Sequence, residues 1–238
     1  MGGMLHNLLA TSITFVLSVA WLRIMNALAH RGMLSQTLSR KIIHTGTGPL
    51  FVLCWPLFSD SALSRFWAAL IPLAIALQFA AVGLGLIEDE AAVAAMSREG
   101  NPRELLRGPL YYGLAFVFCT VVFWRSSPVG ILALMILCGG DGLADIVGRR
   151  WGTRKLPLNP QKSWAGSGAM FVGSVIFSIG MLWWFDGLGY VTFSPTAGSV
   201  LLVGAIALAA TVVEALPVKD IDNLTLTATG ICLGMLLM

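Results

Sequence analysis

The feature that most constrains this chain is a series of long apolar runs that follow one another from end to end. A helix needs about 20 mostly apolar residues to cross the hydrocarbon core of a bilayer. The runs meet or approach that length, although the second, fourth and last are short enough to be re-entrant or tilted. They predict an all-α, polytopic integral membrane protein with about seven or eight transmembrane helices and no soluble domain, so that residues 1–238 form a single membrane domain. The runs cover residues 8–29, 42–59, 63–86, 109–124, 128–147, 164–185, 198–216 and 222–238.

Composition excludes the main alternative classes. Only 11% of the residues are charged and 57% are hydrophobic, whereas soluble domains carry about 25% charged residues. Such a chain is neither disordered nor an ordinary soluble enzyme. The net charge of +3 is too small to indicate nucleic-acid binding. The four cysteines lie singly inside apolar runs without CxxC spacing, which predicts buried thiols rather than zinc ligands or disulfides.

Basic residues are concentrated in alternate loops. Twelve of the 15 lie in the loops that follow the first, third, fifth and seventh runs. The positive-inside rule places these loops on the cytoplasmic face, or its equivalent in an organelle, and both termini on the far side. Most acidic residues lie at the same face, which the rule does not require, so this face is predicted to handle anions and a metal; an ordinary solvated face is the alternative. The twelve are Arg31, Arg40, Lys41, Arg98, Arg103, Arg107, Arg149, Arg150, Arg154, Lys155, Lys162 and Lys219.

The stretch "CGGDGLADIVGRRWG" places two carboxylates at the end of an apolar run. Asp141 and Asp145 are four residues apart and therefore share one face of a helix. Ionisable residues at membrane depth are commonly functional, and paired carboxylates suit Mg²⁺ with substrate phosphates completing its shell. Gly140 and Gly142 would let a phosphate approach the backbone. The alternative is an Asp145–Arg149 pair with glycines that only help helices to pack.

A basic segment, "RRWGTRKLPLNPQKSWAGS", follows directly. Cations beside an acidic metal site suit a polyphosphate, whose charge needs both. A P-loop kinase is excluded, because Gln161 precedes Lys162 where the Walker A loop needs glycine. Attraction to anionic lipids is the alternative for the arginines. The residues predicted to contact phosphate in this segment are Arg149, Arg150, Lys155, Lys162 and Ser163.

The start of the second run, "RKIIHTGTG", carries a histidine among basic residues. His44 lies four residues after Arg40 and so shares its helix face. A polar face shared with Arg40 and Lys41 indicates an anion contact or a general base, whereas a structural role is the alternative for a lone histidine. The glycines do not complete GxGxxG, and no dinucleotide site is predicted.

The stretch "NPRELLRGPLYY" contains a recognisable helix start. Asn101 is expected to cap this helix, with Pro102 at its first position and Glu104 at its third. Tyr111 and Tyr112 are typical of side chains that anchor a helix at the membrane surface.

A second acidic group lies around a proline break in "EALPVKDIDN". Glu214 stands at the inner end of the seventh run, and Asp220, Asp222 and Asn223 follow the break. A carboxylate that faces helix interiors is costly unless it is paired or used. This group is therefore predicted to be functional, with a structural role as the alternative.

These motifs, in this order, resemble those of phytol kinases and farnesol kinases. The resemblance covers about residues 38–230, and the parts within 140–152 and 155–168 are the most specific. This polyprenol kinase family is more distantly similar to dolichol kinase and to the CTP-using phosphatidate cytidylyltransferases. The matching blocks are "RKIIHTGTGPLFVLCWPLFS", "ELLRGPLYY", "GDGLADIVGRRWG", "LPLNPQKSWAGSGAMF" and "VEALPVKDIDNLT".

The resemblance implies that the protein transfers the γ-phosphate of CTP to an isoprenoid alcohol. Phytol would become phytyl phosphate in the salvage of phytol toward tocopherol, with farnesol and geranylgeraniol as alternative substrates. The residues themselves do not distinguish CTP from ATP. The implied location is a chloroplast envelope or thylakoid membrane, or a bacterial or cyanobacterial membrane, with the active face cytoplasmic or stromal.

The residues agree with this type of reaction. Asp141 and Asp145 would hold Mg²⁺, and Glu214, Asp222 or His44 would orient or deprotonate the alcohol. The prenyl tail would lie between helices at membrane depth. Contacts to the nucleotide and its phosphates are expected from Arg40, Lys41, Gly140, Gly142, Arg149, Arg150, Lys155, Lys162, Ser163 and Asn223.

Three other classes share parts of this pattern. A phosphatidate cytidylyltransferase also uses CTP, but its Asp-Arg followed closely by another Asp is missing here. A CDP-alcohol phosphotransferase needs Ala-Arg where this chain has Asp145–Ile146. A transporter would favour inverted repeats and charges at the membrane midplane, whereas the charges of this chain collect at one face.

Overall fold

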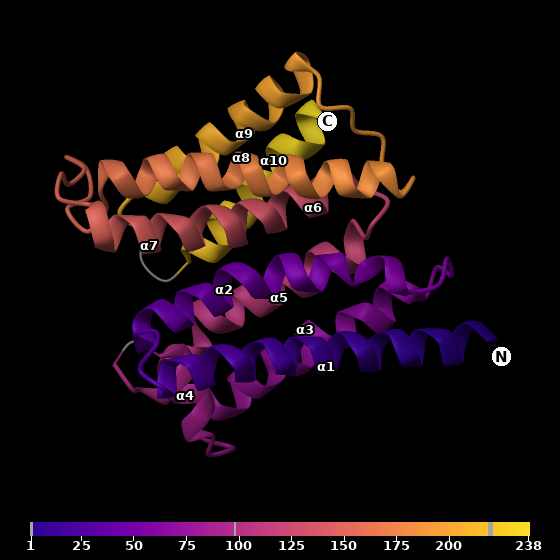
Figure 1. The fold of residues 1–238 in the computed structure, drawn as a ribbon, viewed down its shortest axis with the longest axis horizontal. Coiled ribbons are helices and arrows are strands. Elements are labelled where there is room, and N and C mark those ends of the chain that lie inside the picture. Colours follow the sequence, from indigo (N-terminus) through magenta and orange to yellow (C-terminus); the bar gives the residue numbers. More distant parts are fainter. Residues whose placement is uncertain (1, 98, 219–220) are drawn as a thin grey trace.

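The computed structural model describes residues 2–97, 99–218 and 221–238, which are mostly helical (Figure 1). Arg98, Lys219 and Asp220, which belong to the charge pattern above, lie outside the described residues. Two 3₁₀ helices, η1 (Trp55–Leu57) and η2 (Pro102–Leu106), and one π-helical turn, η3 (Ile136–Gly140), interrupt the α-helices. The α-helices are α1 (Gly2–His30), α2 (Gln36–Leu53), α3 (Ser64–Gly83), α4 (Glu90–Met96), α5 (Gly108–Val122), α6 (Pro128–Met135), α7 (Asp141–Trp151), α8 (Trp164–Gly187), α9 (Ala197–Ala215) and α10 (Asp222–Leu237).

Within the described residues, six helical segments are long and apolar enough to cross a membrane. They are α1, α3, η2 with α5, the continuous segment from α6 to α7, α8 and α9. The prediction of an all-α, multi-pass membrane protein is confirmed, but the expected count of seven or eight spans is not met. Two expected spans fall short, because α2 begins with a polar turn that carries Arg40 and Lys41, and α10 has only 16 residues.

The basic connections lie together at one end of the helix bundle. In Figure 1 the ends of α1, α7 and α9, and the starts of α2 and α10, face the left side, where α4 also lies. Both termini of the drawn chain lie toward the right side. This arrangement agrees with the alternation of basic loops along the sequence. We call the two sides the basic end and the opposite end.

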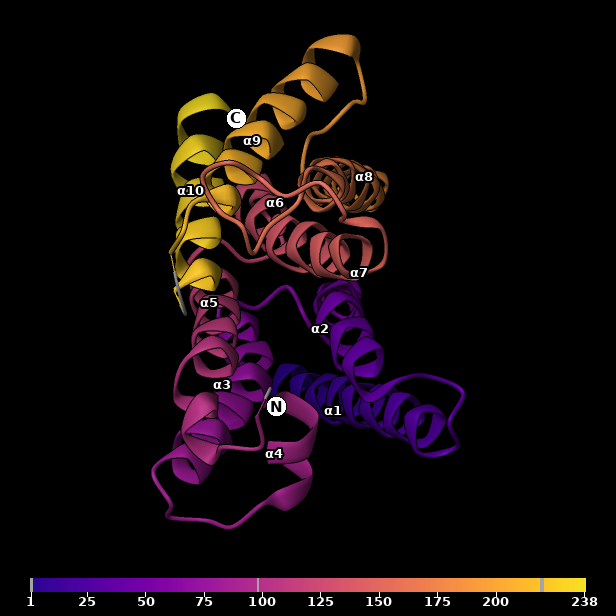
Figure 2. The same cartoon turned by 90° about the vertical axis from the view of Figure 1, so that its left-hand side faces the viewer.

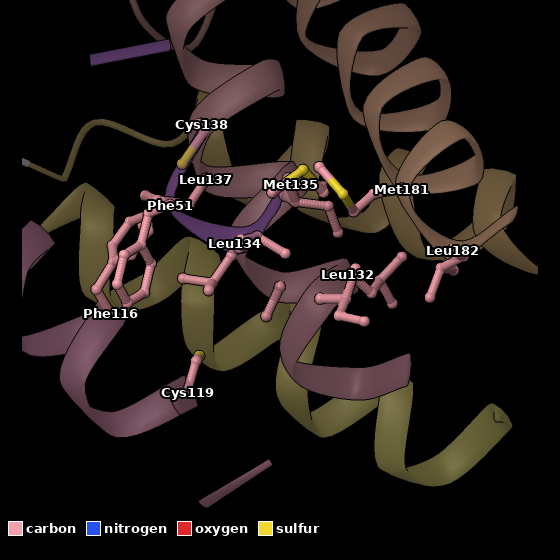
Figure 3. Packing of buried hydrophobic residues seen from close by; sticks show 14 of the residues in the cluster. Phe51, Phe116, Cys119, Leu132, Leu134, Met135, Leu137, Cys138, Met181 and Leu182 are labelled. Carbon is pink, nitrogen blue, oxygen red and sulfur yellow. The ribbon is translucent and has the colours of Figure 1, made fainter. Parts of the chain in front are cut away.

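The continuous segment from α6 through η3 to α7 is the central helix of the bundle. In the most apolar 18-residue stretch of this segment, 83% of the residues are buried, against 44% or fewer in the corresponding stretches of the other five segments. Figure 3 shows Leu132, Met135 and Leu137 of this helix near Phe116 of α5 and Leu182 of α8, and all five side chains are buried. Because α2, α5, α8 and α10 all pack around the central helix (Figure 2), a charge placed on it enters the protein interior.

The π turn η3 stands in the central helix directly before Asp141. A π turn accommodates one extra residue in a helix and is frequent at functional sites. Two glycines in this turn allow α8 to pack closely against it: the position of a Cβ at Gly139 is taken by Phe177, and that at Gly140 by Ser174 and Met170. Gly173 of α8 adds to this close contact, because the position that a Cβ would take there meets the Gly139 carbonyl oxygen.

Two smaller sequence predictions have mixed outcomes. The side chain of Asn101 caps η2 by accepting a hydrogen bond from the Arg103 amide (3.0 Å), as predicted. All four cysteines are free, and three of them are buried. The prediction of buried thiols is wrong for Cys232, which is exposed on α10.

Candidate functional site

Two side chains of α2 face the carboxylate of Asp141 inside the bundle. Asp141 is the first residue of α7 and is only 7% exposed. Lys41 Nζ lies 3.7 Å from Asp141 Oδ2, and His44 Nε2 lies 3.3 Å from the same oxygen. A buried carboxylate needs such partners, because an uncompensated charge in the protein interior is strongly destabilising. The first turns of α2 therefore bring the charge that makes Asp141 tolerable on the central helix.

Lys41 also joins Asp141 to Asp145. Its Nζ atom lies 3.9 Å from Asp145 Oδ2, so both carboxylates face the same ammonium group. The two acids thus share one face of α7, as their spacing predicts. Asp145 Oδ2 also accepts a hydrogen bond from Arg149 Nε at 2.8 Å, so the alternative pair considered from the sequence is present as well.

The predicted glycines lie between packed helices. The position that a Cβ would take at Gly142 is filled by Thr45 of α2, which brings α2 against α7. Gly140 faces α8 in the same manner, and both glycines are buried. This geometry supports the packing alternative for the glycines. An approach of phosphate to their backbone stays a prediction.

Tyr112 contacts His44 from α5. The two rings are 4.3 Å apart between centroids, and the Tyr112 hydroxyl donates to the His44 carbonyl oxygen at 2.7 Å. The same hydroxyl lies 3.2 Å from Cys138 Sγ. The sequence interpretation of Tyr112 as a surface anchor missed this contact. The available signal was that consecutive residues of a helix cannot share a face, so Tyr111 and Tyr112 could not both point to the membrane surface.

A second ion pair joins Lys162 to Glu214, the penultimate residue of α9. The connection between α7 and α8 folds back on itself to deliver Lys162: Lys155 and Ser163 form an antiparallel bridge, and Asn159 Nδ2 donates to the Leu216 carbonyl at 3.3 Å. Burial alone would lower the pKa of Lys162, but the carboxylates of Glu214, Asp141 and Asp222 together outweigh burial, and the pKa is raised. Lys162 therefore keeps its positive charge at neutral pH.

The two ion pairs belong to one site. Lys162 interacts electrostatically with Asp141 and Asp222 as well as with Glu214. Beside Asp222, Asn223 Nδ2 donates to the Gly108 carbonyl at 2.7 Å and so ties the start of α10 to the start of α5. We call the group formed by Lys41, His44, Asp141, Lys162 and Glu214 the charge cluster; it combines side chains of α2, α7 and α9 with the connection before α8.

The other predicted basic residues make contacts of their own. The side chain of Arg149 is 55% exposed, and the Arg150 guanidinium lies 5.3 Å from the centroid of the Trp151 ring. Lys155 is exposed on the folded connection. Arg40 Nη1 donates to the Ser97 carbonyl at 2.9 Å, just beyond α4. The role of these four residues in nucleotide binding stays a prediction.

Ser163 is the last predicted contact residue, and it has a local structural role. Its Oγ atom accepts a hydrogen bond from the Gly166 amide at 3.2 Å and caps α8. An N-cap serine satisfies an amide that the first helical turn leaves without a partner. The cap fixes Ser163, which is adjacent to Lys162, at the point where the folded connection joins α8.

Comparison with known proteins gives close relatives over nearly the whole chain. The chain is 44% identical over 232 residues to the probable chloroplastic phytol kinase of Triticum aestivum, covering 96% of this chain and 76% of that protein. It is 42% identical over 217 residues to the chloroplastic phytol kinase 1 of Arabidopsis thaliana, with 91% and 71% covered. It is 40% identical over 235 residues to the chloroplastic farnesol kinase of Arabidopsis thaliana, with 98% and 76% covered.

This chain belongs to the family of phytol and farnesol kinases. The resemblance stated from the sequence motifs is therefore confirmed. As a member of the phytol and farnesol kinase family, the protein is a phosphotransferase with an alcohol acceptor. No family model matches the chain, and no solved structure matches it.

The acidic residues of this kinase can be tested for their fit to a magnesium ion. Within residues 2–97, 99–218 and 221–238, no three His, Cys, Asp or Glu side chains are grouped to hold a metal. Asp141 and Asp145 do offer two carboxylates toward one point, which Lys41 faces. Mg²⁺ is commonly held by one or two carboxylates together with substrate phosphates and waters. The pair therefore fits an ion that binds together with a nucleotide.

Proposed function

We propose that this chain transfers the γ-phosphate of CTP to phytol and releases phytyl phosphate and CDP. The names of its relatives support phytol or farnesol as the acceptor. CTP as the donor rests on the resemblance of the motifs to polyprenol kinases. Farnesol and geranylgeraniol are the alternative acceptors. By analogy with the chloroplastic relatives, the protein would work in a plastid membrane, or in a bacterial membrane, with its basic end toward the stroma or cytoplasm.

The observation that carries this proposal is the charge cluster at the basic end of otherwise apolar helices. Phosphoryl transfer depends mainly on positioning and on the stabilisation of charge spread over phosphate oxygens. The cluster holds two ammonium groups, Lys41 and Lys162, each paired with a carboxylate on a different helix. An incoming polyphosphate offers these ammonium groups new anionic partners without moving the helix backbones.

Each residue of the site would have a separate role in the reaction. Lys41 and Lys162 would bind phosphate oxygens, and Glu214 would hold Lys162 in position. Mg²⁺ bound at Asp141 and Asp145 would supply positive charge to the phosphates. Because the first turns of α2 and α7 are fixed against each other, these groups are pre-organised, which is where electrostatic catalysis gains most.

A direct assay tests the proposal. The purified protein in detergent, with Mg²⁺, is given CTP or ATP labelled at the γ-phosphate, together with phytol, farnesol or geranylgeraniol. We expect label to enter the organic phase as a prenyl monophosphate, fastest with CTP and phytol. The Asp141→Asn variant, purified in parallel, controls for contaminating kinases.

Two outcomes would contradict the proposal. Transfer from ATP alone would remove the CTP assignment and leave the kinase in place. Incorporation of α-label into a lipid with phosphatidic acid as substrate, without any transfer to the alcohols, would instead make the chain a cytidylyltransferase.

A further inference from the structure

The folded connection between α7 and α8, residues 152–163, joins two helical segments that are long and apolar enough to cross a membrane. Trp151 is the last residue of the first segment, and Trp164 is the first residue of the second. Both indole side chains are exposed. In Figure 1 the connection lies beyond the ends of both helices on the basic end. It therefore lies where the chain leaves one span and enters the next.

Two exposed tryptophans fix the depth of α8 in a bilayer. Trp164 is 62% exposed at the basic end, and Trp183 is 63% exposed near the opposite end. They are 19 residues apart, which corresponds to about 29 Å along a helix. The hydrocarbon core of a bilayer is about 30 Å thick, and tryptophan is enriched at both of its surfaces. Trp164 therefore marks one membrane surface, and the connection before it lies at the level of the lipid headgroups.

The charges carried by this connection all have the same sign. No Asp or Glu occurs anywhere in residues 146–185. Lys162 turns inward to Glu214, whereas Arg154 and Lys155 are exposed. Basic side chains close to a bilayer surface attract anionic lipids. The sign of the exposed charge therefore indicates the partner that this surface fits.

An arginine lies next to a tryptophan at each end of the connection. At the end of α7, the Arg150 guanidinium lies 5.3 Å from the centroid of the Trp151 ring. At the start of α8, the Trp164 amide donates to the Arg154 carbonyl oxygen at 3.1 Å, so these two residues are neighbours across the folded connection. A guanidinium suits a phosphate group, and an indole suits the boundary between apolar and wet surroundings. A lipid presents both environments in one molecule.

We propose that the folded connection selectively binds the headgroup of an anionic lipid, with Arg154 at the lipid phosphate and Trp164 at the top of the acyl chains. Arg154 is the one basic residue of this segment that is not among the predicted nucleotide contacts, so the two sites do not need the same cation. A nucleotide offers the same phosphate chemistry, but it has no acyl chain to lie beside an exposed indole. The lipid site goes beyond the proposed kinase function and does not depend on it.

Quenching of tryptophan fluorescence by brominated lipids measures which lipid lies beside Trp164. The protein is reconstituted into bilayers of equal phosphatidylglycerol and phosphatidylcholine, with bromine on the acyl chains of one lipid or the other. The signal of Trp164 is the difference between the wild type and Trp164→Phe. Trp183→Phe gives the matched signal at the opposite end.

We expect phosphatidylglycerol to be preferred at least fivefold beside Trp164, the fold-change that corresponds to about 1 kcal/mol for one basic residue near an anionic surface. We expect no such preference beside Trp183. Equal quenching of Trp164 by the two lipids would contradict the proposal and would leave the exposed cations to a soluble anionic partner.

Matched charge variants show whether the preference is local. Arg154→Gln and Arg31→Gln each remove one exposed basic residue at the basic end, but Arg31 follows α1 and lies outside the connection. Arg154→Gln is expected to remove most of the preference beside Trp164, and Arg31→Gln is expected to retain it. An equal loss in both variants would overturn the site and assign the preference to the diffuse charge of the whole basic end.

Addition of CTP with Mg²⁺ distinguishes the lipid phosphate from a nucleotide phosphate. A preference beside Trp164 that persists at saturating CTP supports the lipid site. A preference that CTP abolishes would instead assign Arg154 to the nucleotide. The readout does not require phosphoryl transfer, so a protein that binds the lipid but transfers no phosphate would contradict the kinase proposal alone.

Discussion

Buried charges at the two ends of the bundle have different kinds of partner. At the opposite end, Arg125 is 3% exposed and donates to the carbonyl oxygens of Trp55 (2.9 Å), Phe58 (2.8 Å) and Ser59 (3.1 Å). At the basic end, the charge cluster pairs ammonium groups with carboxylates from other helices. Backbone carbonyl oxygens are therefore the main partners of the buried charge at the opposite end, whereas side-chain carboxylates are the partners at the basic end.

The partners of Arg125 explain what its charge does. Its guanidinium also pairs with Asp60 and lies over the rings of Trp124 (5.5 Å) and Tyr190 (4.3 Å). These groups belong to three connections: α2 to α3, α5 to α6 and α8 to α9. Arginine suits this role because it presents five donors in a planar fork and stacks on aromatic faces. Arg125 is therefore a structural clamp that holds three connections together, whereas the charge cluster is the group that we propose to bind the substrate.

The strongest test of this contrast is Asp141→Asn. The substitution keeps the size of the side chain but removes one of the two carboxylate charges that Lys41 faces, and with it one proposed Mg²⁺ ligand. We expect turnover to fall by about 100- to 1,000-fold, comparable to the loss of one electrostatic catalytic group. Thermal unfolding in detergent should be little changed. An active Asp141→Asn enzyme would place this acid with the structural charges.

Arg125→Met is expected to lower stability without changing substrate binding, the opposite of Asp141→Asn. The carbonyl oxygens of Trp55, Phe58 and Ser59 lose the guanidinium as a hydrogen-bond donor, although the Trp55 oxygen still accepts from the Phe58 amide. We therefore expect the free energy of unfolding to fall by about 3 kcal/mol. The midpoint of thermal unfolding in detergent measures this loss. KM for CTP and for phytol in the remaining folded protein should be unchanged. A changed KM with unchanged stability would show that the opposite end also contacts substrate.

Lys162→Ala should affect both nucleotide binding and stability. It removes a proposed phosphate ligand and leaves Glu214 buried without its partner. We expect KM for CTP to rise about tenfold, in line with one charge-assisted contact, together with some loss of stability. Adding Glu214→Gln should restore the stability but not KM. Recovery of KM in the double variant would make the pair purely structural.

Arg150→Ala should have the smallest effect. Arg150 is exposed and lies over the Trp151 ring, an arrangement worth about 0.5–1 kcal/mol. We expect KM for CTP to change less than it does in Lys162→Ala, measured under the same conditions. An effect as large as that of Lys162→Ala would extend the charge cluster to the outer surface of the basic end.

The helical fold and the core of the site could be predicted from the sequence for physical reasons. In a bilayer the backbone must satisfy its hydrogen bonds internally, so an apolar run becomes a helix. Charged residues are rare in such runs, which makes Asp141 and Glu214 conspicuous. Helical spacing then placed Asp141 and Asp145 on one face, and the structure confirms that both face Lys41.

Three features could not be predicted in the same way. The basic segment before α8 has no helical period. Lys162 turns inward while Lys155 stays exposed because of contacts within the folded connection, namely the Lys155–Ser163 bridge and the hydrogen bond from Asn159 to Leu216. The clamp at Arg125 depends on carbonyl groups of a distant connection, which leave no pattern in the sequence. The inward turn of Tyr112 depends on which helix lies beside α5, and local spacing does not contain that information.

The π turn η3 has a consequence for rotation along the central helix. Before the turn, Leu132 and Leu134 of α6 are buried in the core, and after it, Asp141 and Asp145 of α7 face Lys41 of α2. Each residue of an α-helix advances about 100° around the axis. Deleting one residue within Ile136–Gly140 would therefore leave both halves helical but rotate Asp141 and Asp145 away from Lys41. The π turn therefore fixes the rotation of α7 relative to α6 about the helix axis. Changing its length by one residue would change the direction in which both carboxylates point.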